Sequence, residues 1–198
     1  MESVKAYYEA RAREYDDWWL GQGLYAEHRP EGWDEERELL AHWIADLPPA
    51  RTLDVACGTG FMTRHLRGEI VGLDQSESML EIARRQAPHV QFARGNALEL
   101  PFPDDAFDRV FTSYFYCHLE EEERLRFLSE ARRVAPELIV VGTVLREGEE
   151  PARWDERVLK DGSRWEVFKR VFVPEELANE VRGHVLHVSR LFVMVASP

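Results

Sequence analysis

The sequence predicts an α/β fold built on a doubly wound, mostly parallel sheet, with helices ahead of the sheet and a hairpin behind it. From Arg51 onward, short apolar runs alternate with helical patterns at the spacing of right-handed strand-helix-strand units. The first run, residues 52–56, breaks into a turn with Gly58 and Gly60, which is typical of the rim of a nucleotide-type pocket. The 198 residues suffice for one domain with a substantial core.

Composition limits the classes of function. The hydrophobic fraction of 44% and the aromatic fraction of 11% are those of a folded globular protein. The formal net charge of -12 disfavours nucleic acid as a partner, because the surface as a whole repels phosphate backbones. Cys57 and Cys117 lie in apolar segments, which predicts buried, reduced thiols. No run has the pattern of a signal peptide or a membrane span, so we expect a cytoplasmic protein.

Residues 1–50 are predicted to form a helical cap, or lid, on a core of residues 51–198. Residues 4–19 have the spacing of an amphipathic helix rich in aromatic side chains. A second helix is expected from a cap at Asp34 to about Ala45, ended by two prolines. The aromatic residues of this cap predict either packing against the core or a roof over a pocket.

The core is predicted to alternate strands and helices. The expected strands are residues 52–56, 70–73, 90–93, 109–113 and 138–144. A short helix is expected at residues 60–66, a second from a cap at Ser76 to Arg85, and a third at residues 120–135. One face of the third helix is expected to carry Leu125, Leu128, Ala131 and Val134.

The last third of the chain is expected to close the sheet. Residues 146–151 predict a turn-rich connection and residues 165–173 a strand. The charges of Lys169 and Arg170 are interpreted as those of a solvated edge strand, with a cation for an acidic substrate as the alternative. Pro174 opens a helix. Two apolar runs at 185–189 and 191–196 predict an antiparallel hairpin.

The chain resembles the class I S-adenosylmethionine-dependent methyltransferases in four ordered motifs. These are LDVACGTG at 53–60, VGLDQSESML at 71–80, GNALELPFPDDAFDRVFTS at 95–113 and EARRVAPELIVV at 130–141. The pattern is similar to that of the small-molecule enzymes of ubiquinone and menaquinone biosynthesis. The resemblance implies a Rossmann-like, seven-stranded sheet whose last strand is antiparallel, S-adenosylmethionine as cofactor, and methyl transfer to oxygen, nitrogen or carbon of a small molecule.

Residues at the ends of the first strands are the candidates for cofactor binding. Gly58 and Gly60 allow a sharp turn and a close approach. Asp54 supplies negative charge for an ammonium group, or caps the amides of its own loop. Asp74, at the carboxyl end of the second strand, can accept from two ribose hydroxyls. The other candidates are Tyr15, Ala56, Gln75, Met79, Asn96, Ala97 and Ser113.

The sequence departs from the family pattern at two of these positions. Asn96 stands where the family more often has an acid, and its carboxamide can still accept and donate. Ala56 stands where many relatives have glycine. A dinucleotide-binding site, the competing interpretation, would require glycine at position 63, where the chain has Thr63, and would place a pyrophosphate beside Asp54.

The segment after the fourth strand is expected to face the methyl acceptor. His118 has the ordinary pKa of a general base, or is a structural histidine. Tyr114 and Tyr116 are the other catalytic candidates. The resemblance implies that the segment before the first strand folds over the cofactor, where aromatic faces favour a sulfonium cation, and the cap is also expected to supply substrate contacts. These are Tyr8, Tyr25 and Trp19, with Trp18 as the alternative to Trp19. The histidines form no metal-ligand constellation.

The sequence thus predicts an S-adenosylmethionine-dependent methyltransferase that positions a small acceptor for in-line displacement. Two other classes stay open. One is a protein of the same fold that binds the cofactor without catalysis, and the other is a protein or RNA methyltransferase. The acidity of the chain disfavours RNA.

Overall fold

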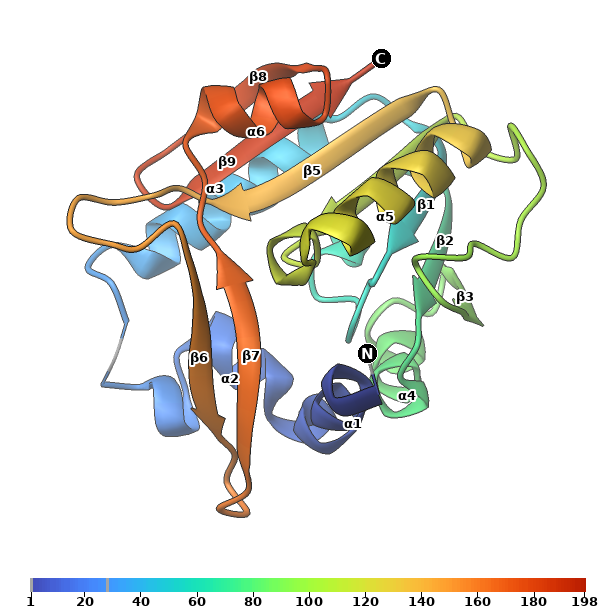
Figure 1. The fold of residues 1–198 in the computed structure, drawn as a ribbon. Helices are drawn as coiled ribbons and strands as arrows, with labels where there is room; N and C mark the ends of the chain where they lie inside the picture. Colours follow the sequence, from blue (N-terminus) through green and yellow to red (C-terminus); the bar gives the residue numbers. More distant parts are fainter. Residues whose placement is uncertain (1, 28) are drawn as a thin grey trace.

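One sheet of seven strands organises the chain (Figure 1). The computed structural model describes residues 2–27 and 29–198. The strands are β1 (Ala50–Val55), β2 (Gly68–Asp74), β3 (Gln91–Arg94), β4 (Arg109–Ser113), β5 (Glu137–Thr143), β8 (His184–Val188) and β9 (Phe192–Ser197). Their order is β3-β2-β1-β4-β5-β9-β8. β1 to β5 pair in parallel, and β9 is antiparallel to both of its neighbours, β5 and β8, which confirms the predicted Rossmann-like sheet with its C-terminal hairpin.

Helices cover both faces of this sheet (Figure 1). They are α1 (Glu2–Arg11), α2 (Tyr15–Leu20), α3 (Trp33–Asp46), α4 (Glu77–Gln86), α5 (Glu121–Val134) and α6 (Pro174–Glu180). Ser76 caps α4 as predicted, because its Oγ accepts from the backbone N–H of Met79 at 3.1 Å. Glu120 and Glu123 form a capping box at the start of α5.

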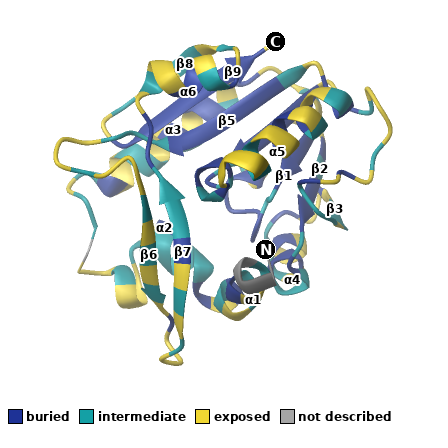
Figure 2. Cartoon of the chain, in the orientation of Figure 1, coloured by how far each residue is buried: buried dark blue, intermediate teal, exposed yellow. Residues whose placement is uncertain are grey.

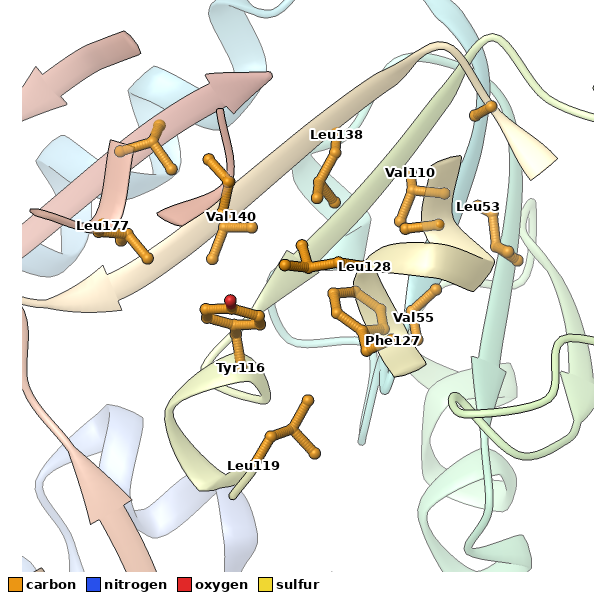
Figure 3. Packing of buried hydrophobic residues seen from close by; sticks show 14 of the residues in the cluster. Leu53, Val55, Val110, Tyr116, Leu119, Phe127, Leu128, Leu138, Val140 and Leu177 are labelled. Carbon is orange, nitrogen blue, oxygen red and sulfur yellow. The ribbon is translucent and has the colours of Figure 1, made fainter. Parts of the chain in front are cut away.

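The core therefore has two halves, one on each side of the sheet. Figure 3 shows the first, in which Phe127 and Leu128 of α5 pack over Val55 and Val110. The second half lies against α3 and the N-terminal helices and includes Phe111 of β4. Strands β5 and β9 are buried almost throughout, as Figure 2 shows. A strand buried on both faces has the continuous apolar sequence that predicted it.

Two helical predictions were wrong in detail. The helix expected at residues 60–66 is only a 3-10 turn, Thr63–His65. Leu125 is 64% exposed, whereas Phe127 on the same helix is fully buried. Steps of about 100° per residue place Phe127, Leu128, Ala131 and Val134 on one side of α5 and Leu125 on the other.

The N-terminal helices also differ from the expectation. A 3-10 turn, Ala12–Glu14, interrupts the helix expected over residues 4–19 and changes the direction of the residues after it. Gly32, with φ of 71°, is the N-cap of α3 in place of Asp34. Asp34 lies in the first turn of that helix, where it pairs with Arg29 at 2.5 Å and Arg37 at 3.1 Å.

A second hairpin lies outside the main sheet. It consists of β6 (Ala152–Val158) and β7 (Arg164–Arg170), which pair antiparallel beside α1 and α2 (Figure 1). The sequence predicted only the second of these strands, as a solvated edge. On β6 the half-buried residues are Arg153, Asp155 and Arg157, so the strand has no apolar face to reveal it.

Candidate cofactor and acceptor site

A cleft of about 830 Å³, here called the strand-end cleft, opens where β1, β2 and β4 end. Parallel strands bring their carboxyl ends to one rim of a sheet, which is where ligands bind in this architecture. The residues predicted for the site that line this cleft are Tyr8, Tyr15, Ala56, Gly58, Asp74, Gln75, Met79, Asn96, Ala97, Ser113, Tyr114 and His118. Those that sequence reasoning missed are Leu73, Gly95, Leu98, Phe115, Leu119 and Glu123, which flank the predicted ones along the chain.

Asp74 ties the glycine turn to the second strand. Its Oδ2 accepts from the backbone N–H of Gly58 and its Oδ1 from that of Ser76, each at 2.9 Å. Gly58 has φ of 55°, in the left-handed region that favours glycine. Burial raises the pKa of Asp74, while the backbone hydrogen bonds lower it. The carboxylate is thus held in one orientation at the rim, with further lone pairs to offer a ligand.

Asp54 and Gly60 do not line the cleft but lie behind the turn. Asp54 is buried, and its Oδ2 accepts from the hydroxyl of Thr63 at 2.6 Å. Its Oδ1 has no hydrogen-bond partner among the described residues, and burial raises its pKa to about 7. At Gly60, with φ of 77°, a Cβ would lie 3.3 Å from that of Ala83, so this glycine lets the turn pack on α4.

Asn96 is held by its own loop. Its Oδ1 accepts from the backbone N–H of Leu98 at 3.0 Å. Ala56, the other departure from the family pattern, takes φ of 59° at the end of β1. An alanine therefore occupies the left-handed conformation that glycine adopts without strain.

The charge of the strand-end cleft fits a cationic cofactor. Among its described lining residues, Asp74 and Glu123 are acidic and none is lysine or arginine. The N-terminus of α4 is already occupied, because the Glu9 carboxylate accepts from the backbone N–H groups of Glu77 and Ser78 at 2.9 and 3.3 Å. A pyrophosphate would thus meet carboxylates, whereas the ammonium and sulfonium groups and ribose hydroxyls of S-adenosylmethionine suit this set of groups.

Hydrogen bonds attach the N-terminal helices to the segments that border this cleft. Asp16 accepts from the hydroxyl of Thr59 at 2.6 Å and from the Gln86 side-chain amide, so it joins α2 to the glycine turn and to α4. Tyr15, the residue before it, lies against the turn: a Cβ added at Gly58 would be 3.6 Å from its ring. Tyr15 is therefore part of the cleft wall, and Asp16 attaches the helix that carries it to the glycine turn and to α4.

A second cavity of about 600 Å³, here called the basic chamber, adjoins the cleft. It lies between the N-terminal helices, the β6-β7 hairpin and the segment after β4. Four side chains line both spaces, namely Tyr8, Tyr15, Tyr114 and His118. The residues that line the chamber alone are Tyr7, Arg11, Trp18, Tyr25, Cys117, Arg157, Val167 and Lys169. Of these, sequence reasoning selected Tyr25 for substrate contact and raised Trp18 and Lys169 as alternatives.

His118 stands at the junction of the two spaces with a defined tautomer. Its Nδ1 lies 2.7 Å from the carbonyl oxygen of Phe168 on β7. A carbonyl only accepts, so Nδ1 carries the proton and Nε2 presents a lone pair in the neutral ring. Burial is the main cause that lowers the pKa of His118 to about 4. The hydrogen bond to the Phe168 carbonyl opposes this shift, and the cations Lys169, Arg157 and Arg11 add to it. His118 is therefore neutral at neutral pH.

Two residues predicted for the acceptor side lie away from both spaces. Trp19 is 2% exposed and stacks on Phe61 with ring centroids 5.3 Å apart, while Trp18 lines the chamber. The 3-10 turn before α2 sets this choice between adjacent tryptophans. Tyr116 is fully buried, and its hydroxyl donates to Glu180 of α6 at 2.8 Å. It joins the turn after β4 to α6.

Comparisons with known proteins agree with this geometry. Residues 52–137 match a family described as a methyltransferase domain. A demethylmenaquinone methyltransferase of Thermotoga maritima is 37% identical over 103 residues, which are 50% of this chain and 44% of that protein. A 2-phytyl-1,4-naphtoquinone methyltransferase of Trichormus variabilis is 30% identical over 66% of this chain and 59% of that protein.

Over residues 52–137 the chain is thus similar to known methyltransferase domains. It spans about half the length of the curated relatives it matches. The structure of a complex named DhpI-SAM-HEP superposes on this chain with a TM-score of 0.79 at 26% identity, over 100% of this chain and 97% of the other. Among the residues described, no helix is long and apolar enough to cross a membrane, and no group of histidine, cysteine and acidic side chains could hold a metal ion.

Proposed function

We propose that this protein transfers a methyl group from S-adenosylmethionine to a small molecule. One observation carries the proposal: two spaces of different chemistry meet at the side chains of Tyr8, Tyr15, Tyr114 and His118. Bound in the strand-end cleft, S-adenosylmethionine supplies an activated methyl group on a sulfonium sulfur and takes up the C–S electron pair as a neutral thioether. The basic chamber is then the place for the acceptor.

The residues of the strand-end cleft divide the work of holding the cofactor. Asp74 accepts from the ribose hydroxyls, and Met79 and Asn96 contact the adenine. Gly58 and Ser113 give access to the methionine half, with Tyr15 as its roof. Asp54 supports the turn from behind and acts at a distance on the ammonium group. The assignments rest on the lining of the cleft and the two hydrogen bonds that fix Asp74.

For methyl transfer, the basic chamber must orient the acceptor, exclude water and, for some acceptors, supply a base. Tyr8 and Tyr114 form the walls at the junction and Tyr25 contacts the acceptor from the cap. Where the attacking atom is a hydroxyl oxygen or an amine nitrogen, its proton goes to Nε2 of His118. Tyr116 takes no part in this proposal, since its hydroxyl is engaged by Glu180.

A protein that only binds the cofactor would not require the basic chamber, and a chamber walled by the N-terminal helices, the β6-β7 hairpin and the segment after β4 suits a small molecule better than a polymer. These observations favour a small-molecule enzyme over the two open alternatives. We propose further that residues 1–50 act as a lid on a core of residues 51–198, and that the protein works in the cytoplasm without nucleic acid or membrane as partner.

Calorimetry and a transfer screen test the proposal together. We expect S-adenosylmethionine and S-adenosylhomocysteine to bind to the protein and NAD not to bind. A screen of small acceptors with methyl-labelled cofactor is expected to yield labelled product. Tight NAD binding without S-adenosylmethionine binding would contradict the family's chemistry in this chain. Cofactor binding without transfer to any small molecule, protein or RNA would favour the non-catalytic alternative.

A further inference from the structure

We infer that the basic chamber binds the anionic group of its acceptor, so that the substrate is a small organic acid with a carboxylate or a phosphate. This inference deepens the proposed function and rests on it. Three cationic side chains from three separate elements line the chamber: Arg11 at the end of α1, Arg157 on β6 and Lys169 on β7. No carboxylate lines it within the described part of the chain. In a chain of net charge -12, this is a local reversal of sign.

The charges in the chamber are incompletely neutralised. Arg157 pairs with Asp155 at 2.8 Å, but the same carboxylate also binds Arg153 at 2.8 Å. Neither Arg11 nor Lys169 forms an ion pair with a carboxylate among the residues described. The buried Nε of Arg11 has no hydrogen-bond acceptor. Unpaired cations in a partly desolvated space are costly, and an anion bound between them offsets that cost.

Aromatic rings hold Arg11 in place without satisfying its N–H groups. The guanidinium carbon lies 4.9 Å from the ring centroid of Tyr15, 5.6 Å from that of Tyr7 and 5.7 Å from that of Tyr25. Stacking of this kind orients a guanidinium before a ligand arrives. The buried Nε–H of Arg11 has no acceptor among the described residues, so this donor stays available for a carboxylate or phosphate.

A buried hydroxyl adds an independent, neutral donor. Tyr7 is 1% exposed, lines the chamber, and its hydroxyl has no hydrogen-bond partner among the described residues. Such a group in the interior ordinarily has a partner. A bound oxyanion would accept from this hydroxyl as well as from the cations. One ligand would thus provide an acceptor for both the Tyr7 hydroxyl and the Nε of Arg11.

The register of the β6-β7 hairpin gathers the charges on one face. Arg153 pairs with Lys169 and Arg157 with Trp165, so all four lie on the half-buried side. Burial lowers the pKa of Lys169, and the neighbouring arginines lower it further. Lys169, Arg157 and Arg11 in turn lower the pKa of His118. An anion in the chamber opposes the effect of these cations, raises the pKa of both groups, and makes His118 a stronger base when an acceptor is present.

Calorimetry at low ionic strength, on the protein alone and saturated with S-adenosylhomocysteine, tests this inference. The probes are benzoate, phenyl phosphate and the neutral benzamide, whose ring suits the aromatic walls. We expect at least one anion to bind about tenfold or more tighter than benzamide, because only an anion can form charge-assisted hydrogen bonds with the cations of the chamber. The stronger of the two anions identifies the preferred oxyanion.

Variants locate the binding. Arg11→Gln and Lys169→Gln are each expected to weaken anion binding about tenfold or more, and Tyr7→Phe to weaken it about threefold to tenfold. Arg164→Gln is the matched control, because Arg164 is on the same strand as Lys169 but on its exposed face, paired with Glu156. It is expected to change the affinity less than about twofold. Tyr7→Phe removes only a hydroxyl and keeps the test valid if Arg11→Gln disturbs α1.

The possible failures are distinguishable. Anions that bind no better than benzamide, or whose binding survives both Arg11→Gln and Lys169→Gln, would overturn the inference. So would the absence of anion binding up to about 10 mM, well above the range of a usable substrate site. If S-adenosylhomocysteine binds in the same samples, only this inference fails. If it does not bind, the proposed function fails.

Discussion

The strand-end cleft and the basic chamber share four side chains but differ in charge and in construction. The cleft carries Asp74 and Glu123 and no described cation, whereas the chamber carries three cations and no described carboxylate. The cleft is formed by segments that directly follow parallel strands. The chamber is assembled from α1, the β6-β7 hairpin and the turn after β4, which lie far apart in the sequence. One fold thus holds two spaces of opposite charge side by side, one formed at the ends of strands and the other by segments that are distant in the sequence.

His118 joins the two spaces, and its removal gives the largest expected effect. If the acceptor loses a proton to Nε2, His118→Gln lowers kcat by about 10² to 10⁴, the range of general-base catalysis. Cofactor affinity is expected to stay within about twofold. Steady-state kinetics with the acceptor found by screening and calorimetry with S-adenosylmethionine measure the two quantities. His184→Gln, at an exposed position of β8, is the control. An unchanged kcat would remove His118 from the chemistry.

Asp74 belongs to the cleft alone, so its replacement should separate the two spaces. Asp74→Asn places an N–H group against a backbone N–H of Gly58 or Ser76 and removes the charge that faces the ribose. We expect cofactor affinity to fall about 100-fold, from two altered hydrogen bonds to a charged group, while anion binding in the chamber is unchanged. Asp108→Asn, at the exposed far end of β4, is the matched control. An equal loss of cofactor affinity in Asp74→Asn and Asp108→Asn would contradict the assignment of Asp74 to cofactor binding.

The acids that end β1 and β2 differ in their surroundings, and pH separates them. Burial raises the pKa of Asp54 from its ordinary 3.8 to about 7 in the folded protein. A raised pKa contributes stability that is fully present below about 3.8 and lost as pH rises through about 7. Relative to Asp54→Asn, the protein is expected to lose about 1.4 kcal/mol of unfolding free energy per pH unit in this window. Urea unfolding of the protein and of Asp54→Asn at pH 5 and pH 8 measures this loss. A difference in unfolding free energy between the two proteins that is the same at both pH values would contradict the burial of this carboxylate.

Ala56 gives the smallest expected effect. With φ of 59°, it bears a strain of about 1 kcal/mol that glycine would not, and glycine adds unfolded-state freedom of similar size. Ala56→Gly is therefore expected to change the unfolding free energy by less than about 1 kcal/mol and cofactor affinity by less than about twofold. Thermal unfolding and calorimetry measure these. A large loss of affinity would mean that the alanine side chain itself contacts the ligand.

Many residues that line the cleft could be selected from the sequence because they stand at or just after the carboxyl end of a strand. Asp74, Asn96 and Ser113 are examples, since a parallel sheet brings such positions together. Asp54 shows the limit of this rule: one residue earlier in its strand than the rim, it lies behind the turn. The seven-stranded sheet with its antiparallel last strand followed from the family resemblance and from the apolar runs that form β5, β8 and β9, whereas the order of the strands comes from the structure alone.

The chamber could not be predicted in the same way. Arg157 was missed because β6 has alternating charged residues on its inner face and resembles a loop. Arg11 and Tyr7 belong to a helix whose phase relative to the pocket depends on tertiary packing. Trp19 was chosen over Trp18 because the 3-10 turn at Ala12–Glu14 leaves no signal in the apolar spacing. Tyr116 was misassigned because its partner, Glu180, is 64 residues away.

A crystal structure with S-adenosylhomocysteine and benzoate tests most directly whether the strand-end cleft holds the cofactor and the basic chamber the acceptor. We expect the nucleoside beside Asp74, Met79 and Asn96 in the strand-end cleft, and the carboxylate between Arg11 and Lys169 in the basic chamber. His118 is expected at the boundary with its Nδ1 still on the Phe168 carbonyl. A nucleoside bound elsewhere, or a carboxylate in the cleft beside Asp74, would contradict the division of the site into two spaces of opposite charge.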